Sequence, residues 1–254
     1  MKFLCLPGAY SNAEGFKAQL GPFAQEVERQ GIATFAWTQG LNEVYPPETF
    51  VNNFGVGKLY KFIETDTMFD RDDPQTLRDF PADAGTAEDT LRQLVTVRDR
   101  YPLVSESVTR AVDQLLREID EDPDIAGILG YSEGAMTAAT VLLEEGKRAK
   151  REGKERRLKC AIFMGGWPPF SRKDEKSGYD IILCDETDEV IDVPTLHVIG
   201  CHDPYMLASK ALFNICDEET SEMFDHGKGH SVPRDMRSVK DLCGPLRRLV
   251  GRAN

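Results

Sequence analysis

A serine flanked by two glycines stands where a short apolar run gives way to a helix-forming stretch. Residues 130–134 read Gly-Tyr-Ser-Glu-Gly, between the apolar run 125–129 and the stretch 135–145. This order of strand, G-x-S-x-G and helix is typical of a nucleophile elbow, a turn that exposes the serine hydroxyl, here that of Ser132. A hydroxyl attacks a carbonyl only beside a base and an oxyanion site. The pattern therefore predicts acyl-transfer chemistry, and its alternative is an ordinary strand-to-helix turn.

An acid and a base follow the serine in the order that this chemistry uses. Asp203 comes directly after the apolar segment 193–200, and His230 follows the next strand-like segment. The order Ser, Asp, His, with each partner just after a strand, is that of α/β-hydrolases. A triad is recognised by geometry rather than by position, so unrelated polar loops remain the alternative. Asp188 and Asp192, just before the strand, are the other candidates for the acid.

Acyl transfer also needs two N–H donors aimed at the oxygen of the tetrahedral intermediate. One should be the backbone N–H of Glu133, directly after the serine. The other should come from the turn at 7–12, which follows the first apolar run. Ala9 is the first candidate there and Tyr10 the second, because Pro7 has no N–H.

The other three histidines are less suited to act as the base. His197 lies within a strand pattern and is expected in the core, whereas His202 directly precedes the candidate acid. By residue type, His202 could form a zinc site with Cys201, His226 and His230, but the spacing of these residues matches no standard ligand pattern. We therefore expect neither a metal nor a cofactor.

The composition limits the partners and the compartment. The chain has 254 residues, a formal charge of −12 and a sequence pI of about 4.9. This acidic balance argues against nucleic-acid binding, which leaves a basic footprint. No run approaches eighteen apolar residues, so we expect no membrane span, and residues 1–6 are too short for a signal-peptide core. Six scattered cysteines without C-x-x-C spacing suit a reducing compartment, and we expect a cytoplasmic protein.

Apolar patterns alternate between strand and helix along the chain. Strand-like runs cover 3–6, 32–37, 125–129, 159–164, 194–199 and 222–224, and helical spacing covers 12–30, 107–121, 135–145 and 236–250. Strands alternating with helices predict a mainly parallel sheet with helices on both faces, which is the α/β-hydrolase fold, in a single domain over 1–254.

The region 40–105 breaks this rhythm with prolines, a run of acids and many aromatic residues. We interpret part of it as a cap or pocket wall, and the alternative is a surface excursion pinned by its aromatic side chains. Together with these aromatics, four further residues predict an apolar substrate pocket at the ends of the strands: Tyr10, Trp167, Phe170 and Met206.

One segment departs from the acidic balance. Residues 147–159 hold eight basic side chains against Glu152 and Glu155. A solvated helix end explains this composition, since positive charge complements the helix dipole there. A docking patch for an acidic partner is the alternative.

Several short motifs together resemble the fungal serine-hydrolase family of α/β-hydrolases, which includes polyketide-releasing thioesterases. The resemblance covers nearly the whole chain, and the matching segments are 4–8, 38–40 with Glu43 and 46–47, 130–135, 163–169, 194–200 with 203–204, and 229–233. Pro7 departs from the family, in which many members carry His before the glycine. This puts only the local geometry of that loop in doubt.

The resemblance implies Ser132 as nucleophile, Asp203 as acid and His230 as base in the hydrolysis of esters or thioesters without metal or cofactor. It also implies a place in secondary metabolism, with release of a polyketide or fatty acyl chain from the carrier domain of a polyketide synthase. A stand-alone carboxylesterase acting on small acyl esters is the alternative enzyme. A catalytically silent binding protein is the alternative from another class, since a fold alone never proves activity.

Overall fold

The computed structural model describes residues 1–45, 57–64, 85–94, 101–172 and 177–253. Its centre is a six-stranded sheet in the order β10-β9-β6-β5-β1-β2, and every neighbouring pair of strands in it is parallel. The strands are β1 (Lys2–Leu6), β2 (Thr34–Trp37), β5 (Ile125–Tyr131), β6 (Cys160–Met164), β9 (Thr195–Ile199) and β10 (Ser221–Asp225). Strands such as β6 are buried throughout, which explains why they read as apolar runs without alternation.

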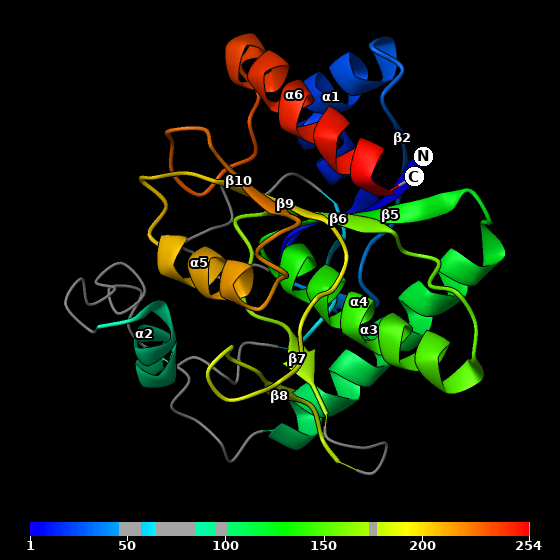
Figure 1. Cartoon of the computed structure of the whole chain (residues 1–254), viewed down its shortest axis with the longest axis vertical. Helices are drawn as coiled ribbons and strands as arrows, with labels where there is room; N and C mark the ends of the chain where they lie inside the picture. Colours follow the sequence, from blue (N-terminus) through cyan, green and yellow to red (C-terminus); the bar gives the residue numbers. More distant parts are fainter. Residues whose placement is uncertain (46–56, 65–84, 95–100, 173–176, 254) are drawn as a thin grey trace.

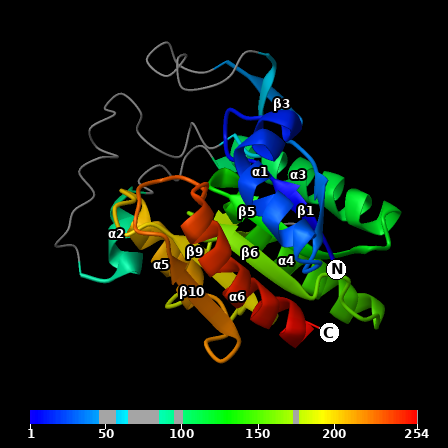
Figure 2. The same ribbon diagram turned by 90° about the horizontal axis from the view of Figure 1, so that it is seen from above.

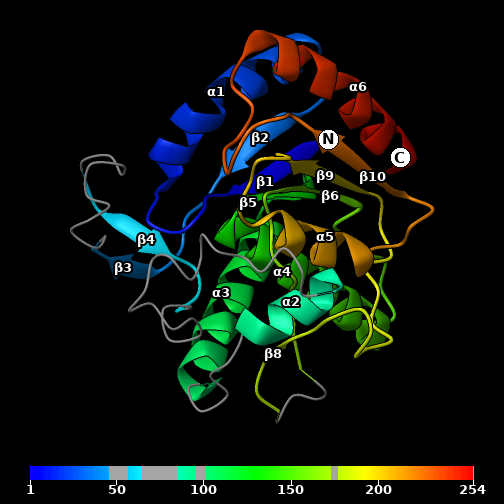
Figure 3. The same ribbon diagram turned by 90° about the vertical axis from the view of Figure 1, so that its left-hand side faces the viewer.

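Helices cover both faces of this sheet (Figures 1 and 3). One face carries α1 (Ala13–Arg29) and α6 (Met236–Ala253). The other carries α2 (Ala87–Leu94), α3 (Tyr101–Glu121), α4 (Glu133–Glu152) and α5 (Met206–Asn214). Two separate apolar clusters, one for each face, fill the space between sheet and helices. The prediction of an α/β-hydrolase fold is confirmed. Within the described residues, no helix is both long and apolar enough to cross a membrane.

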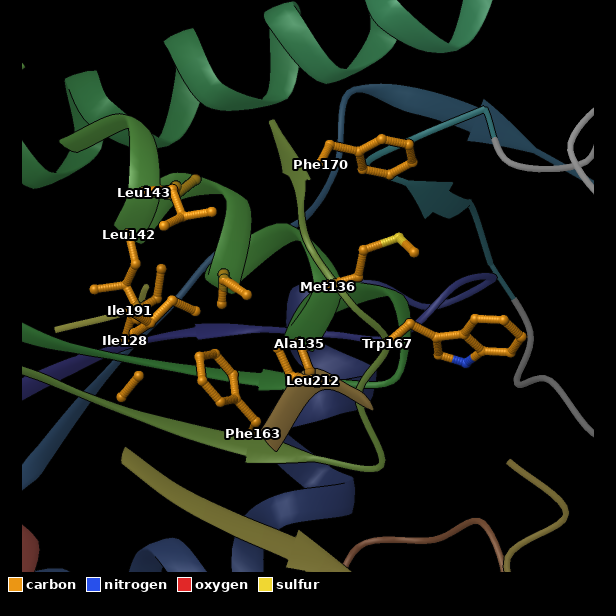
Figure 4. Packing of buried hydrophobic residues seen from close by; sticks show 14 of the residues in the cluster. Ile128, Ala135, Met136, Leu142, Leu143, Phe163, Trp167, Phe170, Ile191 and Leu212 are labelled. Carbon is orange, nitrogen blue, oxygen red and sulfur yellow. The ribbon is translucent and has the colours of Figure 1, made fainter. Parts of the chain in front are cut away.

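Helix α4 extends from the serine turn, and most of its residues are buried. Ala135, Ala138 and Ala139 are fully buried, and such small side chains let a helix approach the sheet closely. Figure 4 shows how Met136 and Leu142 on this helix pack with Phe163 and Trp167. The helix is longer than the predicted 135–145 and ends in a left-handed Gly153.

The region 40–105 is described only in part. It contains an antiparallel hairpin of β3 (Asn42–Val44) and β4 (Leu59–Lys61), then α2, which packs against α5. The hairpin lies beside the start of α1 (Figures 2 and 3), where Asn12 donates a hydrogen bond to the Lys58 carbonyl. Residues 46–56, 65–84 and 95–100 lie outside the described residues, so a cap over the site stays a prediction.

The sequence patterns missed the short elements. A second small antiparallel pair joins β7 (Phe170–Ser171) to β8 (Asp180–Ile181). The strands β3, β4, β7 and β8 and the helices α2 and α5 are all too short to show a periodic pattern.

The basic residues of 147–159 largely pair with acids of this chain. Arg148 donates to both carboxylate oxygens of Asp120 on α3, at 2.8 and 2.9 Å. Arg156 donates through Nε to the buried Glu145 at 3.1 Å. This stretch therefore fixes the end of α4 to its surroundings, a role that neither sequence interpretation included.

Candidate active site

Ser132 stands in a strained turn between β5 and α4. Its backbone has φ 54° and ψ −120°, a left-handed region that a non-glycine residue adopts only when its surroundings force it. A Cβ on Gly130 would lie 2.2 Å from the Gly134 carbonyl oxygen, and a Cβ on Gly134 would lie 2.3 Å from the Leu6 carbonyl oxygen. Both glycines of the pentapeptide are thus required by close backbone packing. The Ser132 side chain makes no capping hydrogen bond to α4 and is left for another partner.

That partner is His230. Its Nε2 lies 3.0 Å from Ser132 Oγ, and its Nδ1 lies 2.7 Å from Asp203 Oδ2. An ionised carboxylate can only accept, so Nδ1 carries the proton and Nε2 is free to accept one from the serine. The Asp203 side chain is 3% exposed and that of His230 20%. The structure therefore brings together the three residues that the sequence singled out, in one continuous hydrogen-bonded chain.

Asp203 is held by the backbone that follows it. Its second oxygen, Oδ1, accepts the N–H of Tyr205 at 2.8 Å. The other candidate acids lack this position: Asp192 pairs with Arg156 near the end of α4, and no contact joins either it or Asp188 to His230 among the described hydrogen bonds.

Three residues that the sequence did not single out hold the His230 ring. The Tyr131 ring stacks on it with centroids 5.2 Å apart, and the Tyr205 ring meets it edge-on at 5.0 Å. The Tyr131 hydroxyl also donates to the His230 carbonyl at 3.1 Å, and burial raises its pKa well above the usual range, so it stays a donor. Gly165, with φ 56°, leaves little room for a side chain, because a Cβ there would lie 3.0 Å from His230 Cε1 and the ring would have to shift.

The position of Tyr131 inside the G-x-S-x-G pentapeptide was the one available signal for these contacts. The aromatic ring before a serine is not itself part of the pattern. Tyr205 follows the acid by two positions and Gly165 follows β6, and neither spacing predicts a contact with a histidine that is distant in sequence.

The remaining histidines lie elsewhere. His197 is buried in β9 with its Nε2 3.0 Å from Thr195 Oγ1, and it packs between the rings of Phe163 and Phe213. Burial lowers its pKa to about 3, so it is neutral. His202 is exposed, and its backbone N–H donates to the Lys228 carbonyl. In the described part of the chain, no group of three or more His, Cys, Asp or Glu side chains is arranged to hold a metal ion.

The two segments expected to supply the oxyanion donors meet at the serine. Glu133 is the first residue of α4, where backbone N–H groups point away from the helix and the helix dipole is positive. The turn at 7–12 packs against Ser132, since a Cβ on Gly8 would lie 3.2 Å from the serine Cβ. Ala9 and Tyr10 follow directly, and Tyr10 has a left-handed φ of 57°.

The four pocket candidates do not lie in equivalent environments. Tyr10 and Met206 are half-buried. Trp167 is 8% exposed, and its ring lies 5.7 Å from that of Tyr205, which connects it to the histidine. Phe170 has no exposed surface and packs into the core on the side of α4 that carries Met136 (Figure 4). Its side chain therefore fills the core, and it presents no surface to a pocket in this structure.

Comparison with known proteins identifies the family. Residues 1–242 match the family described as Serine hydrolase (FSH1). Hydrolase phiM of Talaromyces stipitatus is 27% identical over 252 residues, covering 98% of this chain and 87% of that protein. Esterase FPY3 of Fusarium mangiferae is 31% identical over 156 residues, covering 60% of this chain and 69% of that protein.

Solved structures agree on the fold. Arabidopsis thaliana SOBER1 superposes with a TM-score of 0.54 at 17% identity, covering 98% of this chain and 99% of that one. Zea mays acyl-protein thioesterase 2 superposes with a TM-score of 0.55 at 14% identity, covering 98% of this chain and 94% of that one. At such identities the likeness concerns the fold alone. With the family match across 1–242, the chain belongs to the serine hydrolase (FSH1) family of α/β-hydrolases.

Proposed function

We propose that this serine hydrolase cleaves acyl esters or thioesters with Ser132 as nucleophile, His230 as base and Asp203 as acid. The observation that carries the assignment is the continuous chain from Ser132 Oγ to His230 Nε2 at 3.0 Å, and from His230 Nδ1 to Asp203 at 2.7 Å. These are the distances at which a base can take the proton of a nucleophile and be oriented by an acid.

The first half of the reaction forms an acyl-enzyme. His230 Nε2 takes the hydroxyl proton while Ser132 Oγ attacks the carbonyl carbon, and the carbonyl electron pair moves onto oxygen. Asp203 stabilises the charged imidazole. When the tetrahedral intermediate collapses, the bond to the leaving alcohol or thiol breaks, and the leaving group receives the proton from Nε2. Water then attacks the acyl-enzyme with the same base, and the carboxylic acid and free serine are regenerated.

The oxyanion of each tetrahedral intermediate needs fixed donors. We assign these to the backbone N–H of Glu133 and to that of Ala9, with Tyr10 as the alternative. The packing of both segments against Ser132 and the positive end of α4 support this assignment.

For the substrate, we propose a polyketide or fatty acyl thioester released from a carrier domain in secondary metabolism. The support is the resemblance to polyketide-releasing thioesterases, together with the half-buried Tyr10 and Met206 and with the Trp167 ring, which contacts the Tyr205 ring beside His230. A cytoplasmic location stays a prediction from the scattered cysteines.

One observation favours a stand-alone esterase on small esters as the second candidate. The basic stretch 147–159, which a carrier domain could have used for docking, has most of its charge paired within the chain. Lys150 and Lys154 are also paired, with Asp192 at 3.8 Å and Glu152 at 2.8 Å, but their side chains are 79% and 72% exposed and so could still meet an acidic partner.

Labelling with a fluorophosphonate tests the assignment of the nucleophile. We expect one label on the wild-type protein and none on Ser132→Ala, with turnover reduced by about 10⁶-fold. Ser107→Ala is the matched control, because Ser107 is fully buried and its hydroxyl donates to the Val104 carbonyl instead. A label on another serine would contradict the assignment, and a wild-type protein without any label would indicate a binding protein.

Acyl thioesters of increasing length separate the two substrate classes. Each methylene buried in an apolar pocket contributes about 0.8 kcal/mol, or about a fourfold gain in kcat/KM. A flat dependence would favour the small-ester enzyme. A second comparison tests the partner: the same acyl group is offered once on a carrier domain and once on N-acetylcysteamine. The double variant Lys150→Glu and Lys154→Glu should slow hydrolysis of the carrier-bound substrate only.

A further inference from the structure

A buried ion pair lies directly behind the serine turn. The Glu133 side chain is 6% exposed and that of Lys61 1%, and Glu133 Oε2 lies 3.9 Å from Lys61 Nζ. The other oxygen, Oε1, accepts the backbone N–H of Phe62 at 2.6 Å and that of Ile63 at 3.5 Å. The carboxylate of the residue after the serine thus binds the end of β4.

Strand β4 in turn holds the turn at 7–12. Ser11 and Tyr60 exchange two backbone hydrogen bonds, of 2.9 and 3.4 Å. Lys61 Nζ lies 5.3 Å from the centroid of the Tyr10 ring, within the range of a cation–π contact. These contacts constrain Tyr10, whose left-handed φ of 57° persists only where its surroundings over-determine it.

Stability does not explain why two charges are kept here. Removing both ions of a buried pair in favour of apolar groups is often neutral or stabilising, because desolvation offsets much of their attraction. What the Glu133 carboxylate does provide is a charge-assisted hydrogen bond from the Phe62 N–H at 2.6 Å, with the Lys61 cation 3.9 Å away. This connection joins the start of α4 to the end of β4, the strand that holds the turn at 7–12.

We propose that Glu133 and Lys61 are positioning residues that set the separation of the two oxyanion donors. Glu133 supplies one donor from its own backbone, and its carboxylate fixes, through β4, the turn that supplies the other from Ala9 or Tyr10. Such donors must lie 2.7–3.1 Å from the developing oxyanion, so a shift of the turn weakens catalysis without removing any group that touches substrate. This inference rests on the proposed function.

Glu133→Gln tests the proposal, because glutamine keeps an oxygen for the Phe62 N–H but loses the charge facing Lys61. On p-nitrophenyl butyrate we expect kcat to fall by about 10- to 100-fold, with KM changed by less than about threefold. An alkyl trifluoromethyl ketone, which adds to the serine and places an oxyanion on the same donors, should bind more weakly by the same factor as kcat falls.

The matched control lies on the same helix. Glu145 is also buried, accepts the Arg157 backbone N–H at 2.7 Å and pairs with Arg156 Nε at 3.1 Å. Glu145→Gln therefore makes the same chemical change farther along α4, away from the serine turn. We expect it to lower thermal stability as much as Glu133→Gln does, while kcat and ketone binding stay within about twofold of wild type.

A double variant separates positioning from stability. Lys61→Met added to Glu133→Gln removes the buried cation that faced the lost carboxylate, so thermal stability should recover while kcat and ketone affinity stay low. Recovery of all three would overturn the proposal, as would a Glu133→Gln enzyme that matches the Glu145→Gln control. A wild-type protein without labelling or turnover would instead overturn the proposed function itself, and the inference with it.

Discussion

Replacing Asp203 by asparagine should move the ring proton of His230, the proposed base, from Nδ1 to Nε2 while leaving the fold intact. In the native protein Oδ1 accepts the Tyr205 N–H at 2.8 Å and Oδ2 faces His230 Nδ1 at 2.7 Å. An asparagine must keep its carbonyl oxygen toward the Tyr205 N–H, because its NH₂ group there would face another donor. The NH₂ group is therefore placed against Nδ1, which can only accept from it.

The consequence for the rate follows from the tautomer. With Nδ1 accepting, Nε2 carries the hydrogen and can no longer take the proton of Ser132 from 3.0 Å away. The imidazolium also loses the charge that stabilises it. Together these losses are expected to lower kcat by about 10⁴-fold, which corresponds to about 5.4 kcal/mol of transition-state stabilisation.

The assay is the hydrolysis of p-nitrophenyl butyrate, with the labelling rate by fluorophosphonate as a second readout. Asp225→Asn is the control, since Asp225 also accepts two backbone N–H groups, those of Cys201 and Gly227, at 3.0 and 2.7 Å. It makes no described contact with the histidine. His202→Ala should likewise have little effect. An Asp203→Asn enzyme within tenfold of wild type would refute the reasoning, because the acid would then act without orienting the base.

Three further predictions concern the site and the fold. Gly165→Ala should lower the melting temperature by about 2–8 °C, because alanine costs about 1–2 kcal/mol at a left-handed φ. It should also lower kcat by about tenfold, because its Cβ would lie 3.0 Å from His230 Cε1. Calorimetry and ester hydrolysis measure the two effects, and an unchanged enzyme would contradict the packing. Burial lowers the pKa of His197 to about 3, so below pH 6.5 the unfolded chain binds more protons at this residue than the folded protein does. The contribution of His197 to the free energy of unfolding is therefore complete above pH 6.5 and is lost as the pH falls toward 3, by up to about 1.4 kcal/mol per pH unit. Urea titrations at pH 7 and 5 should show a smaller loss in His197→Asn. Arg156→Met should lower the free energy of unfolding by about 3 kcal/mol, since it leaves the buried Glu145 carboxylate without its cation, and the specific activity should not change.

The central strands and the long helices could be predicted because they bury a continuous apolar run or stripe, as β1 and β6 do. The site could be predicted as far as chain order goes, since Ser132, Asp203 and His230 each follow a strand of a parallel sheet and so lie at one edge. The supports of the site could not. Tyr131, Tyr205 and Gly165 contact His230 across separate crossovers, and no local pattern encodes such contacts.

Other misses have equally physical causes. Phe170 was expected on a loop after a strand, but it begins the short strand β7, and both residues of that strand are buried. A two-residue strand has no period from which its burial could be predicted. The charge of 147–159 was visible in the sequence, but its partner Asp120 lies on another helix. The β3–β4 hairpin, which binds the Glu133 carboxylate, has three residues in each strand and no period to detect.

The placement of the triad along the chain has a consequence for the order of folding. Ser132 and His230 are 98 residues apart, and their contact requires β6, β9 and β10 to add to β5 in turn, each through a crossover. Such non-local pairing forms slowly, whereas helices such as α3 and α4 form from local contacts. Helical signal should therefore return early during refolding and reactivity of the serine late. During synthesis, Ser132 emerges from the ribosome about a hundred residues before His230. On the proposed assignment, the nascent chain is therefore inactive until the loop after β10 has docked.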